Sequence, residues 1–108
     1  MTTILVNLVP PADAPRKPAT VRVSIEEVSQ LDAPAQVVAT KTIADMRVDR
    51  PQQISVDPGV LPAGGRYVVR VHVDLDGSGS KAAGDLITTR AYPIDGTGGT
   101  TAVELHKI

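Results

Sequence analysis

One stretch of the sequence, Tyr67 to Leu75, restricts the fold more than any other. Tyrosine, valine and leucine stand at every second position of this stretch, and mostly polar residues stand between them. Such a period of two residues is typical of a β-strand that buries one face. The alternation stops at the turn-forming run DGSGS, and a β-branched run that suits a returning strand begins at Leu86. The stretch therefore predicts a strand, an acidic glycine-rich loop and a second strand.

Short runs of the same kind continue along the rest of the chain, separated by turns that are rich in proline and glycine. No window of about eleven residues keeps a helical period, so little or no helix is expected. Short strands at this spacing predict an all-β fold, namely an antiparallel β-sandwich of about seven strands with Greek-key-like connections. A partly open barrel is the alternative. The other predicted strands cover residues 2–9, 20–28, 36–43, 52–56 and 101–107.

Length and composition limit the class of protein. The 108 residues predict a single domain over residues 1–108. Its core must be aliphatic, because the chain has two tyrosines but no phenylalanine or tryptophan. The 11 basic and 12 acidic residues form no basic face, which argues against nucleic-acid binding. No run reaches the roughly 20 apolar residues of a membrane span. We expect a soluble chain without an export signal in the sequence as printed.

Catalysis is not expected. The sequence contains no cysteine, which excludes thiolate chemistry and cysteine-based zinc sites. No nucleophile motif such as G-x-S-x-G is present. The near-absence of aromatic residues leaves little for a sugar-binding cleft. His72 and His106 are far apart in sequence, and we interpret both as exposed surface residues on the outward faces of their strands.

The acidic loop has the residue spacing of an EF-hand calcium loop. Counted from its first aspartate, it matches D-x-D-x-S-G-x5-D, with glycine at the sixth position. Calcium prefers about six to eight hard oxygen ligands, and alternate residues of a tight loop can point their side chains inward. The predicted metal ligands are Asp74, Asp76, Ser78, the carbonyl oxygen of Ser80, and Asp85.

Two interpretations of this loop stay open. The flanking segments are predicted strands and not helices, and Lys81 occupies the position where EF-hands carry an aliphatic residue, so this is not an EF-hand domain. It would be an EF-hand-like loop on a β-hairpin, with a structural or stabilising calcium ion. The alternative is an ordinary solvated hairpin loop, for which aspartate, glycine and serine are common residues.

Several segments, in a fixed order, carry a resemblance to a known family. They read LVPPADA, TVRVSIEEVSQLDAPAQVVA, ISVDPGVLPAGGRYVVRVHV and ITTRAYPI, and together they extend from Val6 to Ile94. The chain resembles the YbaY/YscW family of small bacterial lipoproteins. The short hairpin of that family is expanded here into the acidic loop.

The resemblance implies a β-sandwich, an extracytoplasmic setting at the periplasm or outer membrane, and no catalytic residues. One branch of the family consists of pilotins, which escort outer-membrane secretin subunits of type III secretion.

Two functions are therefore expected. The first is a non-catalytic β-domain stabilised by calcium. The alternative is a pilotin-like or chaperone-like interaction module that binds no metal and uses a sheet edge, for which the apolar first strand is the candidate.

Overall fold

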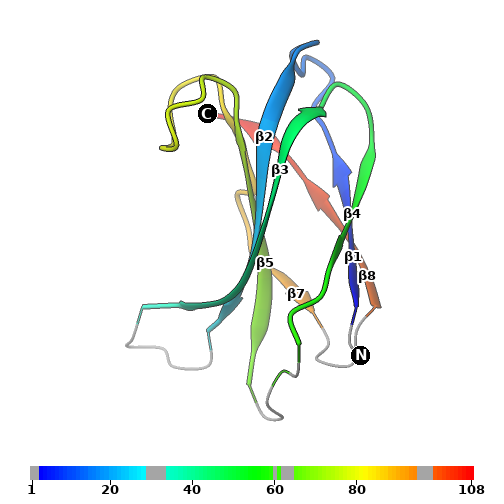
Figure 1. Ribbon diagram of the computed structural model, residues 1–108, viewed down its shortest axis with the longest axis vertical. Helices are drawn as coiled ribbons and strands as arrows, with labels where there is room; N and C mark the ends of the chain where they lie inside the picture. Colours follow the sequence, from blue (N-terminus) through cyan, green and yellow to red (C-terminus); the bar gives the residue numbers. More distant parts are fainter. Residues whose placement is uncertain (1–2, 29–33, 60, 62–64, 95–98) are drawn as a thin grey trace.

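The described residues form nine strands, whose arrangement Figure 1 shows, and they contain no helix, so none that could cross a membrane. The computed structural model describes residues 3–28, 34–59, 61, 65–94 and 99–108. The strands are β1 (Ile4–Val9), β2 (Pro18–Glu27), β3 (Gln36–Arg47), β4 (Gln52–Val56), β5 (Tyr67–Asp74), β6 (Leu86–Ile87), β7 (Tyr92–Ile94), β8 (Gly99–Glu104) and β9 (His106–Lys107).

The strands form two sheets, which confirms the predicted all-β sandwich. The small sheet has the order β4-β1-β8, and the large sheet has the order β3-β2-β5-β6-β9, with β7 also paired to β5. Neighbouring strands are antiparallel except β1 and β8, which run parallel. The chain passes repeatedly from one sheet to the other, so strands distant in sequence become neighbours.

The core lies between the sheets and is aliphatic, as the composition predicts. Alternate residues of β1, β2 and β5 point into it, and Val6, Val23 and Val69 are completely inaccessible to solvent. The alternation predicted for β5 is confirmed, because the side chains of Tyr67 to Val73 at odd positions all belong to this core. Burial of these aliphatic groups is the main contribution to the stability of the fold.

Strand β3 is longer than the sequence pattern indicates, because it continues from the predicted end at residue 43 to Arg47. A β-bulge makes this possible. Two residues of β3, at positions 44 and 45, lie opposite the single residue Thr20 of β2. Asp45 has a φ of 57°, in the left-handed region that aspartate tolerates. The bulge bends the strand, so that Val48 enters the core before β4 begins in the other sheet.

The last part of the chain also differs from the prediction in its segmentation. Val103 and Leu105 are buried as predicted, but the single predicted strand is divided between the two sheets as β8 and β9. The segment Tyr92–Ile94, which was not predicted as a strand of its own, forms β7. The returning strand predicted at Leu86 has only two residues, β6. Strands this short carry too few residues to show a periodicity in sequence.

The burial patterns of β2 and β3 lead to a stability prediction. Ile25 of β2 is 0% exposed, whereas Val37 of β3 is 58% exposed. We expect Ile25→Ala to lower the free energy of unfolding by about 2–5 kcal/mol, because it leaves a cavity in the core. Val37→Ala, the control, should change it by less than about 0.5 kcal/mol. Urea unfolding measures both, and equal losses would contradict this assignment of the core.

Candidate functional site

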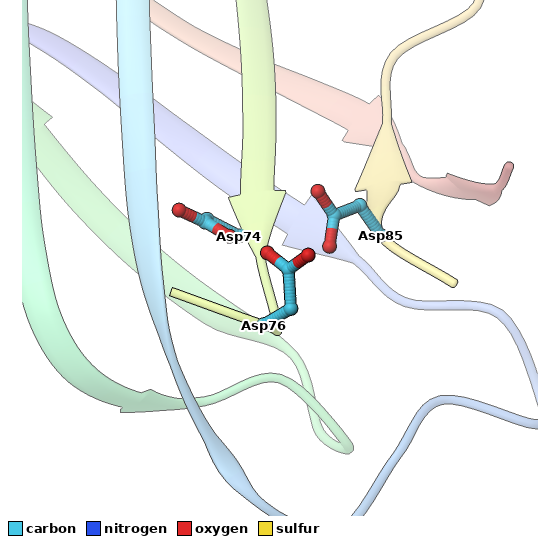
Figure 2. A group of neighbouring side chains, drawn as sticks. All are labelled: Asp74, Asp76 and Asp85. Carbon is cyan, nitrogen blue, oxygen red and sulfur yellow. The ribbon is translucent and has the colours of Figure 1, made fainter. Parts of the chain in front are cut away.

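The acidic loop connects the end of β5 to the start of β6, and Figure 2 shows the side chains of Asp76 and Asp85 turned toward one another, with Asp74 beside them. Asp74 is the last residue of β5, Asp76 lies in the loop, and Asp85 immediately precedes β6. One carboxylate oxygen from each of these residues lies within 4.8 Å of the others. The structure therefore brings together the three carboxylates that the spacing singles out.

Asp74 organises the first half of the loop. Its two carboxylate oxygens accept hydrogen bonds from the backbone N–H groups of Gly77, at 3.0 Å, and Gly79, at 2.8 Å. Both glycines have positive φ, 72° and 80°, a conformation that side-chain-bearing residues rarely adopt. The chain turns here because the two glycines permit a positive φ, and because the Asp74 carboxylate accepts hydrogen bonds from their backbone N–H groups. Asp74 itself is buried, with only 5% of its surface exposed.

The exposed tip of the loop contains the other predicted ligands. Asp76 accepts a hydrogen bond from the N–H of Ser78 at 3.0 Å. The Ser78 hydroxyl donates to the carbonyl oxygen of Ser80 at 3.0 Å, and it accepts from the Ser80 N–H at 3.2 Å. The two serines of the predicted ligand set thus bond to each other, and the Ser80 carbonyl already accepts one donor.

Asp85 is the most buried carboxylate of the group, with its side chain 1% exposed. One oxygen accepts the N–H of Leu75 at 3.0 Å, and the other accepts the N–H of Ala82 at 3.1 Å. The second oxygen also lies 2.8 Å from Nε2 of His72. Asp85 therefore links the loop, at Leu75 and Ala82, to His72 near the end of β5.

The position of His72 corrects the sequence analysis. We predicted an exposed surface residue, but His72 is only 8% exposed and contacts Asp85. Both residues lie on the outer face of the sheet, because His72 is paired with Ile87, two residues beyond Asp85. Only the pairing of β5 with β6 brings these two residues together. That pairing cannot be predicted from the alternation of apolar and polar residues along β5. His106 is exposed as predicted, 3.9 Å from Glu104.

The surrounding donors keep two of the carboxyl groups ionised. The N–H and side chain of Ser78 lower the pKa of Asp76. Burial alone raises the pKa of Asp85, but the hydrogen bonds from His72 and from the Leu75 and Ala82 amides outweigh it and lower the pKa overall. Negative charges are therefore held close together at neutral pH. Such a group can hold a hard cation, or it can cap the backbone of the loop unaided.

A second feature with a binding capacity is the free edge of the large sheet. Strand β3 has twelve residues and lies at the edge, paired with β2. Val37 and Val38 are 58% and 41% exposed. The first strand does not have this role, because β1 lies between β4 and β8 in the small sheet. The sheet-edge partner site predicted for the first strand is therefore wrong for β1, and β3 offers the edge instead.

Lys41 occupies the inner side of this edge. It is paired with the fully buried Val23, so its side chain starts from the core-facing side of the sheet. Its ammonium group donates a hydrogen bond to the carbonyl oxygen of Ser55 on β4 at 2.9 Å. A charge on the inward face of an edge strand discourages uncontrolled pairing with other chains. The same hydrogen bond links the edges of the two sheets.

The hydrogen bonds of Asp85 lead to a pH-dependent prediction. In an Asp85→Asn variant the side-chain amide has one acceptor oxygen and cannot satisfy all three donors, so we expect a loss of about 1–3 kcal/mol at pH 7. Because the pKa of Asp85 is lowered from 3.8, its ionised form contributes stability above that value, and this contribution is lost as the pH falls through the folded-state pKa. The difference in the free energy of unfolding between this variant and wild type should therefore be smaller at pH 3 than at pH 7.

Urea unfolding at the two pH values measures this effect. Asp57→Asn is the control, because Asp57 accepts the N–H of Gly59 in an exposed turn. A loss at pH 7 no larger than that of the control would contradict the role assigned to Asp85.

Comparison with known proteins agrees with the fold and with the resemblance seen in the sequence. An alternative pilotin from the type II secretion system of Vibrio cholerae has a solved structure that is similar to this chain. The TM-score is 0.74 and the identity is 24%, over 99% of this chain and 96% of that chain. At this identity the likeness establishes the shared fold.

The family itself is established by sequence. No curated protein matches the chain. The family model described as type III secretion system lipoprotein chaperone (YscW) matches residues 6–105, which include all the strands from β2 to β8. The acidic loop lies within this range, but the match to the family model does not by itself establish any property of the loop. The chain belongs to the YscW family of secretion lipoprotein chaperones.

Proposed function

We propose that this protein is a chaperone-like interaction module that binds an extended segment of a secretion-system subunit by adding it as a strand to β3. The family supports the class of activity, since its description is that of a chaperone and not of an enzyme. The observation that carries the proposal is the long exposed edge of β3. An outer-membrane secretin subunit is the partner class that the pilotin branch of the family suggests.

Strand β3 is the best suited of the sheet edges for this purpose. It has twelve residues, whereas the edge strands β4, β8 and β9 have five, six and two. Between its two bulges, the segment 39–43 pairs regularly with β2. Regular backbone at a free edge presents N–H and C=O groups in the spacing that another strand requires.

The apolar side chains at one end of the edge add a second type of contact. Val37 and Val38 are more than two-fifths exposed, although valine prefers burial. A bound segment would bury these two valines, and the removal of their apolar surface from water would favour binding. Main-chain hydrogen bonds would then supply affinity along the segment, and these two valines would favour partners with an apolar residue at one end.

Partner binding should depend on the exposed valines of β3. We expect Val38→Asp to weaken binding of an extended segment of the cognate secretin subunit at least about tenfold, because it places an unpaired charge in the docked edge. Val9→Asp is a matched control, since Val9 is 42% exposed and Val38 is 41% exposed. Titration calorimetry with the purified chain measures the dissociation constants.

Amide hydrogen exchange separates strand addition from other modes of binding. Alternate amides of the segment 39–43 should exchange rapidly in the free chain and become protected in the complex, while those of β4 stay unchanged. Tight binding without new protection in this segment would overturn the β3 site. Failure of secretin segments to bind at all would overturn the proposed partner class.

As a second function, we propose that the acidic loop binds calcium through Asp74, Asp76, Ser78, the Ser80 carbonyl and Asp85. The convergence of three carboxylates within 4.8 Å favours it, since their mutual repulsion would be relieved by a divalent cation. The backbone donors that these carboxylates already have would compete with the ion. We therefore expect weak affinity, with a Kd of about 10⁻⁴–10⁻³ M.

Thermal unfolding in EDTA and in millimolar calcium tests this second function. At ten times Kd the ion should stabilise the folded state by about 1.4 kcal/mol, which raises Tm by several degrees. Asp76→Asn should abolish the rise, because Asp76 is exposed and its loss leaves the buried bonds of the loop intact. Asp13→Asn, at an exposed carboxylate elsewhere, should retain it. No calcium-dependent shift in wild type would make the loop a metal-free hairpin.

A further inference from the structure

A cavity of about 180 Å³ opens on the outer face of the large sheet, and none of the three converging aspartates lines it. Strands β2, β5 and β6 and the acidic loop contribute to its wall. The pairing register explains the grouping. Arg22 of β2 is directly opposite His72 of β5, and Ser24 is opposite Arg70, so these side chains share the outer face. Lys81 reaches the same cavity from the loop.

The wall of this cavity is predominantly positive. Arg22, Arg70 and Lys81 line it, and Glu26 is the only carboxylate among the described residues of the wall. Glu26 accepts a hydrogen bond from Nε of Arg70 at 2.9 Å, which uses only part of the donor capacity of that guanidinium. Arg22 and Lys81 form no ion pair with any residue that the structure describes. Three cations and one carboxylate therefore leave this wall with an excess of two positive charges.

Arg22 has the strongest need for a counter-charge. It stands inside the sheet, because β2 lies between β3 and β5, and it is half-buried. The residues opposite it are Thr42 on β3 and His72 on β5, and neither carries a carboxylate. Asp85, which contacts His72, does not line the cavity. A partly desolvated guanidinium without a counter-charge is unfavourable, and a bound anion would relieve this cost.

The size and charge of the cavity select the chemistry of its ligand. A cavity of about 150 Å³ accommodates a benzene molecule, so this one has room for a phosphate group with a few attached atoms but not for a nucleotide. Arginine binds phosphate oxygens through paired N–H groups, and lysine binds them as a point charge. A phosphate monoester carries a charge of about −1.5 to −2 at pH 7, which balances the excess in the wall better than a singly charged carboxylate does. Ser24 and Thr88 add hydroxyl groups to the same wall.

We propose that this basic cavity binds the phosphate group of a small phosphate monoester. Arg22 and Arg70, from neighbouring strands, would bind phosphate oxygens at the sheet, and Lys81 would bind them from the loop. No residue of β3, all of which the structure describes, lines the cavity. The site therefore does not depend on strand addition at that edge. The large sheet would carry two separate binding features, an edge for a protein segment and a cavity for a small anion.

NMR titration of the isotope-labelled chain with inorganic phosphate tests this site. At an ionic strength held constant with sodium chloride, we expect saturable shifts of the Nε–H signals of Arg22 and Arg70. Arg22→Gln should raise the dissociation constant about tenfold, because it removes a charged hydrogen-bond donor. Arg16→Gln, the matched control, removes an exposed charge outside the cavity and should change the constant less than about twofold.

A second variant keeps the test decisive. Lys81→Gln changes an exposed loop residue and should also weaken phosphate binding, so it gives a result even where thermal unfolding shows that Arg22→Gln is not folded. Val38→Asp, which tests the β3 edge, should leave phosphate binding unchanged. Failure of the proposed strand addition and failure of the phosphate site are therefore measured separately.

Four results would overturn this inference. The first is a set of shifts no larger than those from sodium chloride alone at the same ionic strength. The second is phosphate binding that neither Arg22→Gln nor Lys81→Gln weakens. Acetate binding as tight as that of phosphate would make the ligand a carboxylate. Arg22-dependent binding to phosphatidylglycerol vesicles, without saturable binding of inorganic phosphate, would assign the cavity to the phosphodiester of a lipid headgroup.

Discussion

The structure depends on the position of β5 in the large sheet. This strand pairs along its whole length with β2 on one side, and on the other side it pairs with β7 near its start and with β6 near its end. One set of its side chains forms the centre of the aliphatic core. The other set places Arg70, His72 and Asp74 in a line on the outer face. Because a strand alternates its faces strictly, the packing that stabilises the fold also fixes the spacing of these polar groups.

The sequence predicts the parts of this fold that depend on local pattern. The alternation in β2, β4 and β5 identifies strands and inward residues, and the glycines and aspartates of the loop predict the turn after β5. Features that depend on pairing between distant segments are not visible in that pattern. The bulge at Asp45 is defined by the pairing of β3 with β2, and the two-residue strands β6 and β9 exist only because a neighbour pairs with them. The parallel pairing of β1 with β8 is equally non-local.

The same distinction explains which parts of the candidate sites were predictable. Asp74, Asp76 and Asp85 belong to one hairpin loop, so their spacing in sequence was sufficient to bring them together. His72 joins Asp85 only through the register of β5 with β6, and burial of that contact was therefore missed. The cavity was harder to predict, because Arg22 and Arg70 are more than forty positions apart in the sequence. The exposed edge of β3 could be recognised only from the order of the strands in the sheet, which the sequence pattern does not show.

Asp85 physically connects the acidic loop to the cavity on the outer face. Its carboxylate lies 2.8 Å from Nε2 of His72, which lines the cavity, and it belongs to the group of three aspartates. Lys81, another cavity residue, stands next to Ala82, whose N–H the same carboxylate accepts. A change in the position or charge of Asp85 must therefore act on both features, because the two are joined through its hydrogen bonds. The loop consequently contributes to the shape of the basic cavity through the hydrogen bonds of Asp85.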